Sequence, residues 1–151
     1  MSPFSIFTEN TALFRIMPRL YRVILPVDDI ARAERFYAAV LGMPGIRVSP
    51  GRHYFDCDGT ILACFDPRAD GDGVDAKPNP DHVYLAVKNL DEVMIAARKA
   101  GCSWIEEKIE KRPWGEVSFY ARDPFGNPIR FTQPPEGPIT VPSAEELRAA
   151  T

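Results

Sequence analysis

The chain lacks any uninterrupted apolar stretch approaching the roughly 18 residues that a membrane-spanning helix needs. It also lacks an excess of basic residues, because 18 Lys and Arg stand against 21 Asp and Glu and leave a formal net charge of −3. We therefore expect neither a membrane nor a nucleic acid as a partner. With 151 residues, 45% of them apolar and 26% charged, the composition is that of one soluble globular domain.

The fingerprints of several enzyme classes are missing as well. There is no GxSxG elbow, no GxxxxGK[ST] loop and no GxGxxG turn after a strand, which argues against the corresponding acyl-transfer and nucleotide-binding enzymes. Cysteine is scarce: Cys57, Cys64 and Cys102 are odd in number and form no CxxC pair. We expect them to be reduced and buried, in a cytoplasmic protein.

What the chain does contain is a repeat. The segment YRVILPVDDIARAERFYAAVLGM, which starts at Tyr21, is matched by DHVYLAVKNLDEVMIAARKAGC, which starts at Asp81. Each copy has period-two alternation of apolar residues, then a capping residue (Asp29 or Asn89), then an amphipathic stretch that ends at glycine. Two copies are too few for a solenoid, so we expect two similar modules that close on one another.

Turn signals divide the rest of each copy into further strands. RHYFDCDGTILACF predicts a hairpin about Asp58-Gly59, and GEVSFYARDPFGNPIRFTQ predicts one about residues 123–127. The expected fold class is therefore α+β, with two βαβββ modules that form a cup-shaped sheet and carry one helix each on the outer side. In the first strands, alternation assigns Arg22, Ile24 and Pro26, and likewise His82, Tyr84 and Ala86, to the face away from the helix.

The predicted organisation is an N-terminal arm (1–17), module one (18–66), a Pro-, Gly- and Asp-rich linker (67–80), module two (81–134) and a C-terminal tail (135–151). The arm does not have the pattern of a targeting segment. Either it results from translation that starts upstream of Met17, or it is an ordered arm that packs on a partner subunit. In the tail, Ser143 and Glu146 have the spacing of a capping box, which predicts one short helix.

Three features together carry a family resemblance: the paired β-α units, the helix reading FYAAVLGM, and Trp114-Gly115 followed by FYARDPFGNPIRFTQP. They resemble the vicinal oxygen chelate superfamily, which includes glyoxalase I, bleomycin-resistance proteins, fosfomycin-resistance enzymes and extradiol dioxygenases. The resemblance covers about residues 18 to 134. It implies metal ligands at the cup-facing residue of the first and last strand of each module. Those positions hold Arg22, Leu62 or Ala63, His82 and Arg130.

Of these, only His82 can coordinate a metal, because arginine is always protonated and offers no lone pair. We therefore expect no metal and no other cofactor at the usual place. A displaced metal site at His82 remains as an alternative, and His53, Glu116 and Cys64 could in principle build a shifted site. Their spacing gives no support for one.

The same cup suggests an anion site, because Arg22, Arg130 and His82 could donate hydrogen bonds to one ligand. Glu116 is a further candidate, and the alternative is that it forms a structural pair with these arginines. Trp114 and Tyr84, with Phe65, could supply an apolar wall, although aromatic residues on strands are more often core.

Three functional hypotheses follow. The first is a metal-free small-molecule-binding protein of the glyoxalase and bleomycin-resistance type, with an anionic or polar aromatic ligand in a cleft that a homodimer can share. The second is an enzyme, lyase or dioxygenase-like, that uses His82 with a displaced metal or uses acid-base chemistry without one. The third is a structural or regulatory dimer whose cup is filled by its own side chains. The sequence does not decide whether the protein is catalytic.

Overall fold

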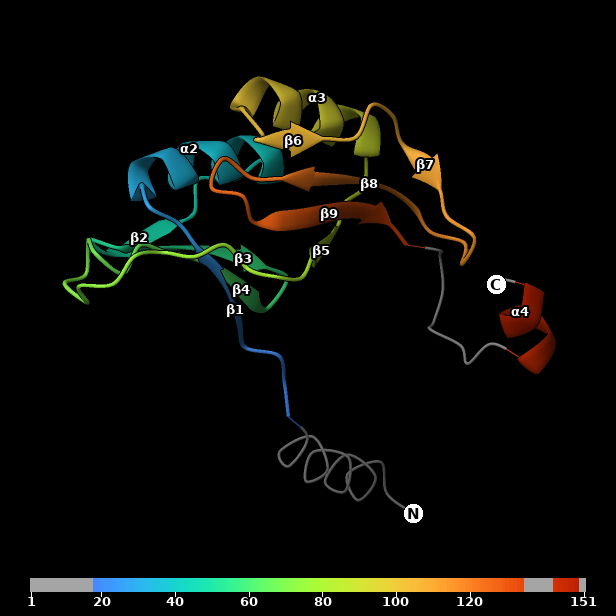
Figure 1. The fold of residues 1–151 in the computed structure, drawn as a ribbon, viewed down its shortest axis with the longest axis horizontal. Coiled ribbons are helices and arrows are strands. Elements are labelled where there is room, and N and C mark those ends of the chain that lie inside the picture. Colours follow the sequence, from blue (N-terminus) through green and yellow to red (C-terminus); the bar gives the residue numbers. More distant parts are fainter. Residues whose placement is uncertain (1–17, 135–142, 150–151) are drawn as a thin grey trace, which may run out of the picture.

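The first half of the repeat folds as one strand, one helix and three further strands. In the computed structural model, which describes residues 18–134 and 143–149, these elements are β1 (Arg22–Pro26), α2 (Ile30–Leu41), β2 (Ile46–Ser49), β3 (Arg52–Cys57) and β4 (Thr60–Phe65). The strands form a sheet in the order β1-β4-β3-β2, with β1 parallel to β4 and the others antiparallel (Figure 1). The predicted N-terminal arm and residues 135–142 and 150–151 of the predicted tail lie outside the described residues.

The second half repeats this plan with one difference. Its elements are β5 (Val83–Ala86), α3 (Leu90–Ala100), β6 (Trp104–Ile105), β7 (Glu110–Lys111), β8 (Val117–Arg122) and β9 (Pro128–Gln133). The sheet has the order β5-β9-β8-β6, and β7 also pairs with β8, so the second strand of the module is split into two dipeptides. A short helix, α4 (Ala144–Ala149), follows in the tail. The predicted α+β class with two βαβββ modules is confirmed.

Both main helices begin and end at the predicted residues. The Asp29 carboxylate accepts a hydrogen bond from the Arg32 backbone N–H, and the Asn89 side chain accepts one from the Glu92 N–H. Gly42 and Gly101 end the helices at φ angles of 69° and 95°, in the left-handed region that favours glycine. The capping residues therefore set where each helix begins and ends.

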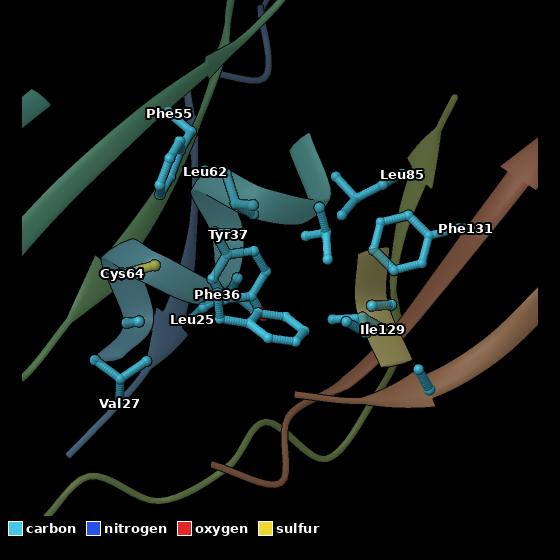
Figure 2. Close-up of a cluster of buried hydrophobic side chains, with 14 of the residues drawn as sticks. Leu25, Val27, Phe36, Tyr37, Phe55, Leu62, Cys64, Leu85, Ile129 and Phe131 are labelled. Carbon is cyan, nitrogen blue, oxygen red and sulfur yellow. The ribbon is translucent and has the colours of Figure 1, made fainter. Parts of the chain in front are cut away.

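One hydrophobic core joins the two modules. The helices pack against each other, and each covers one face of its own sheet (Figure 1). Figure 2 shows Phe36 and Tyr37 of α2 between core residues of the first sheet, such as Leu62, and residues of the second sheet, such as Phe131. Because the helices cover the inner faces, the outer face of each sheet carries the side chains that alternate with the core. We call these the open faces.

The free edge of β1 is capped by side chains from the linker and from the second module. Asn79 Nδ2 donates to the carbonyl of Ile24, and Asn127 Nδ2 donates to the carbonyl of Pro26. Pro26 itself has no N–H to offer a further strand. These contacts fix the first strand of module one against module two.

The three cysteines are free thiols. Burial, with a smaller effect of the Asp123 carboxylate, raises the pKa of Cys64 to about 12 and that of Cys102 to about 11. Such thiols are protonated at neutral pH and are poor nucleophiles. In the described ranges, no helix has the length and apolar character required to cross a membrane.

Candidate functional site

The open face of the second sheet carries a row of three side chains that come from three neighbouring strands. Arg130 lies on the central strand β9, directly across from Tyr84 on β5 and from Tyr120 on β8. The Arg130 Cζ lies 4.6 Å from the centroid of the Tyr84 ring and 3.2 Å from that of the Tyr120 ring. Both rings attract the guanidinium through their π faces, so the row holds Arg130 in place.

Arg130 has no carboxylate partner in the described part of the chain, although only 6% of its surface is exposed. None of its side-chain nitrogens makes a hydrogen bond to a described residue, and its Nε is buried without a partner. A buried charge is usually paired because desolvation without compensation is costly. Arg130 therefore presents an unused set of in-plane donors, and its Nη atoms are suited to bind an anion.

His82 lies next to this row. Its ring centroid is 5.3 Å from that of Tyr120 and 6.4 Å from that of Tyr84. Partial desolvation lowers the pKa of His82 below its usual value, and the positive charges of Arg130 and Arg122 lower it further. The imidazole is therefore neutral at neutral pH and can donate one hydrogen bond and accept another.

A second arginine lies beside Tyr120. The Arg112 Cζ is 4.1 Å from the centroid of the Tyr120 ring. Its Nη2 donates to Glu106 Oε1 at 2.6 Å, and its Nε donates to Ser118 Oγ at 2.9 Å. The same Glu106 oxygen accepts the backbone N–H of Tyr120. Sequence reasoning missed Tyr120, Arg112 and Glu106; alternation along β8 could have identified Tyr120 as a neighbour of Arg130.

Arg22 lies on the open face of the first sheet, away from this row. Its Nη1 donates to the hydroxyl of Tyr54 at 2.6 Å, and the Arg52 Nη1 lies 3.4 Å from the same oxygen. Within residues 18–134 and 143–149, no contact links Arg22 with Arg130 or His82. The structure thus brings His82, Tyr84 and Arg130 together and leaves Arg22 on the other sheet.

The remaining candidates do not join the row. Glu116 lies just before β8, makes no ion pair with a described residue, and has a buried Oε2 without a partner. Trp114 is 54% exposed in the turn that Arg112 and Gly115 close. Phe65 packs under Arg52, whose Cζ is 4.2 Å from the ring centroid. The predicted aromatic wall of Trp114, Tyr84 and Phe65 has no described contact that joins its members.

An apolar cavity of about 660 Å³ lies between the modules and has Tyr84 among its lining residues. This volume is in the range of small-molecule sites, which are mostly apolar with a few polar groups. Most of the cavity's lining side chains lie on the helix-covered faces of the sheets, whereas the Tyr84 ring lies with Arg130 on the open face. The other apolar lining residues include Val23, Leu41, Leu62, Val83, Val87 and Val93.

The four positions at which the resemblance places metal ligands can now be tested. Alternation in β4 directs Leu62 into the core and Ala63 to the open face, across from Ile24. The four residues are therefore Arg22, Ala63, His82 and Arg130. In the described part of the chain, no three His, Cys, Asp or Glu side chains lie close enough to hold a metal ion. This donor set does not fit a divalent metal.

Two βαβββ modules that share one core, each with an open sheet face, define the class of protein: a paired-module α+β protein of the glyoxalase type. The chain belongs to the Glyoxalase/Bleomycin resistance protein/Dioxygenase superfamily, whose family model matches residues 19–131. No curated protein sequence gives a significant match.

Solved structures with the same fold are numerous. A glyoxalase/bleomycin resistance protein from Albidiferax ferrireducens T118 is 24% identical with a TM-score of 0.66, over 76% of this chain and 97% of that one. A glyoxalase-related enzyme from Fulvimarina pelagi is 21% identical with a TM-score of 0.67, over 82% and 94%. A lactoylglutathione lyase from Agrobacterium tumefaciens is 22% identical with a TM-score of 0.59, over 78% and 95%. At these identities the likeness establishes the fold and not the reaction.

Proposed function

We propose that this protein binds a small anionic or polar aromatic molecule on the open face of its second sheet, and that it does so without a metal. The observation that carries the proposal is Arg130, a guanidinium that is buried between Tyr84 and Tyr120 and has no anionic partner in the described part of the chain. A ligand carboxylate would supply the missing partner through charge-assisted hydrogen bonds.

The geometry of the row supports an anion that approaches edge-on. The Arg130 Cζ lies over the Tyr84 ring and over the Tyr120 ring, so a ligand has to approach the N–H groups from a side that neither ring covers. A planar carboxylate matches this direction. The neutral His82, whose ring lies near both tyrosine rings, offers one more hydrogen bond to the same ligand.

We infer further that the protein acts as a homodimer in the cytoplasm. The first sheet exposes Ile46 (71%) and Val48 (53%), which line one hollow with Tyr21, and its open face also exposes Ile24. Apolar side chains that gather on one surface are typical of an interface. A second copy that covers this face would shield it from water and could bring Arg22 to a shared site. The three free thiols are consistent with a reducing compartment.

Benzoate is the probe that tests the anion site. A ligand that binds only the folded state stabilises it by about 2.7 kcal/mol at a concentration of 100 Kd, enough to raise the melting temperature by several degrees. We expect benzoate to raise the melting temperature of the wild-type protein and of Arg35→Gln, which removes the same charge from an exposed position of α2. Arg130→Gln should lose the shift. An equal shift in Arg130→Gln, or none in the wild type with benzoate, acetate or phosphate, would overturn the proposal.

A further inference from the structure

Two guanidinium groups share one aromatic ring in this site. The Arg130 Cζ lies 3.2 Å and the Arg112 Cζ 4.1 Å from the centroid of the Tyr120 ring. Two guanidinium groups cannot both lie over the same ring face at these distances without overlapping, so they lie on opposite faces. The row therefore continues as Tyr84, Arg130, Tyr120, Arg112, with two positive charges separated by a single ring.

Only one of these two charges is compensated. Arg112 and Glu106 form an ion pair at 2.6 Å, with only 14% and 20% of their side chains exposed. Glu106 is also fixed by the Tyr120 backbone N–H at 2.7 Å, so it cannot move to Arg130 without breaking both contacts. Arg130 has no described carboxylate partner.

Glu116 is half-buried just before β8 and makes no ion pair with a described residue, and two further charges that act on His82 oppose one another. Asp81 raises and Arg122 lowers the pKa of His82, so both lie within electrostatic reach of that ring. Both side chains are on the surface, where water and salt screen them. Arg130, Arg112 and Glu106 together therefore carry one uncompensated positive charge.

We propose that Glu106 selects the charge of the ligand: by neutralising Arg112 it leaves one uncompensated guanidinium, and the site binds singly charged carboxylates in preference to doubly charged phosphate esters. This inference rests on the proposed anion site at Arg130. A carboxylate brings one charge to one unpaired guanidinium. A phosphate ester brings a second charge, which would have to be desolvated without a partner.

The test compares benzoate with phenyl phosphate, two flat ligands that differ mainly in charge. At about pH 8 phenyl phosphate is doubly charged, because the second pKa of a phosphate ester is near 6. Isothermal titration calorimetry gives the ratio of the two dissociation constants, phenyl phosphate over benzoate. We expect this ratio to exceed one in the wild-type protein.

Glu106→Gln is the central variant, because the amide oxygen can still accept hydrogen bonds from Arg112 and from the Tyr120 N–H while the charge is lost. With a second uncompensated guanidinium, we expect the ratio to fall by about tenfold. Glu107→Gln removes the same charge from the adjacent exposed residue and is the matched control. Its ratio should stay within about twofold of the wild type.

Two further variants keep the inference testable if Glu106→Gln folds poorly. Arg112→Gln leaves the Glu106 charge uncompensated, so both anions should bind more weakly and the ratio should rise. The double variant Glu106→Gln/Arg112→Gln restores the net charge of the row and should return the ratio toward the wild-type value. If the pair had only a structural role, the ratio would not fall in Glu106→Gln and rise in Arg112→Gln.

The outcomes separate this inference from the proposed function. If benzoate binds in an Arg130-dependent way but the ratio is the same in the wild type, Glu106→Gln and Arg112→Gln, the role of Glu106 is wrong and the anion site stands. If neither probe binds the wild-type protein, or if both bind Arg130→Gln as well, the anion site itself is wrong.

Discussion

The Tyr37 hydroxyl donates a 2.7 Å hydrogen bond to Asp123 Oδ2, which joins helix α2 of the first module to the β8–β9 turn of the second. Both residues are fully buried. The other Asp123 oxygen accepts the backbone N–H groups of Phe125 and Asn127, and the Asn127 side chain reaches from the same turn to the carbonyl of Pro26. The DPFGN sequence is therefore the polar contact between the modules as well as a turn.

Tyr37→Phe tests this contact. It removes one donor from a buried carboxylate and leaves the ring in the core, so we expect the free energy of unfolding to fall by about 1–3 kcal/mol. Tyr21→Phe is the control, because Tyr21 is exposed and its hydroxyl makes no hydrogen bond with a described residue. It should change stability by less than about 0.5 kcal/mol. Urea unfolding measures both; equal values would show that the contact contributes nothing.

Two glycines with nearly the same backbone conformation allow the cost of backbone strain to be measured separately from the cost of steric overlap. Gly42 and Gly45 have φ angles of 69° and 64°. A Cβ on Gly42 meets nothing within 4 Å, whereas one on Gly45 would lie 2.6 Å from His53 Nε2 and 2.7 Å from the Tyr54 carbonyl oxygen. Gly42→Ala should cost about 1–2 kcal/mol through backbone strain alone. Gly45→Ala should cost about 1–3 kcal/mol more because of overpacking, as thermal unfolding can measure.

The His82 pKa reports on the charge of the row. Desolvation lowers it first, and then Arg130 and Arg122. Arg130→Gln should therefore raise the His82 pKa, and saturating benzoate should raise it in the wild-type protein. NMR titration can follow this directly because the chain has 2 histidines. Arg35→Gln should leave the value unchanged; the same result for Arg130→Gln would mean that Arg130 does not act on His82.

The lowered pKa of His82 also makes the free energy of unfolding depend on pH. Between the folded pKa and the usual value near 6.5, the unfolded chain binds more protons than the folded one. The contribution of His82 to the free energy of unfolding is therefore complete above its pKa in the unfolded chain, and it is lost as the pH falls through its pKa in the folded protein. His82→Gln should flatten this part of the curve of unfolding free energy against pH.

Metal analysis tests the metal-free part of the proposal. After purification with added iron, zinc, nickel and manganese, we expect no stoichiometric metal, because arginine occupies two of the four positions where ligands are usual and alanine a third. His82→Ala should have the same metal content as the wild type. Stoichiometric metal that disappears in His82→Ala would support a displaced site and a metal-dependent enzyme.

Light scattering tests the homodimer. The expected mass is twice 16.9 kDa. Ile46→Glu places a charge in the middle of the exposed apolar face of the first sheet and should shift the mass to that of the monomer. Ile95→Glu, on the outer side of α3, replaces another exposed isoleucine and should leave the mass unchanged. If both variants keep the wild-type mass, this face is not the interface.

Much of the site geometry follows from local sequence pattern, and part of it does not. Alternation along β5 and β9 was sufficient to place His82, Tyr84 and Arg130 on one face. The predicted turn at residues 123–127 also sets the register that pairs Arg130 with Tyr120. Alternation could not pair Arg130 with Tyr84 on β5, because the register between those two strands is a long-range property. It also could not foresee that Glu106, which follows the short strand β6, lies beside Arg112.

The sequence by itself determined the repeat, the helix caps, the hairpin turns and the face on which each strand residue lies, because these depend on neighbours a few residues apart. Only the tertiary structure decided which charges meet. It separated Arg22 from Arg130 by placing them on different sheets, and it left Arg130 buried without a described carboxylate while Arg112 gained Glu106. Such pairings depend on which strands and loops lie side by side in the folded module, and the local sequence pattern does not determine that arrangement.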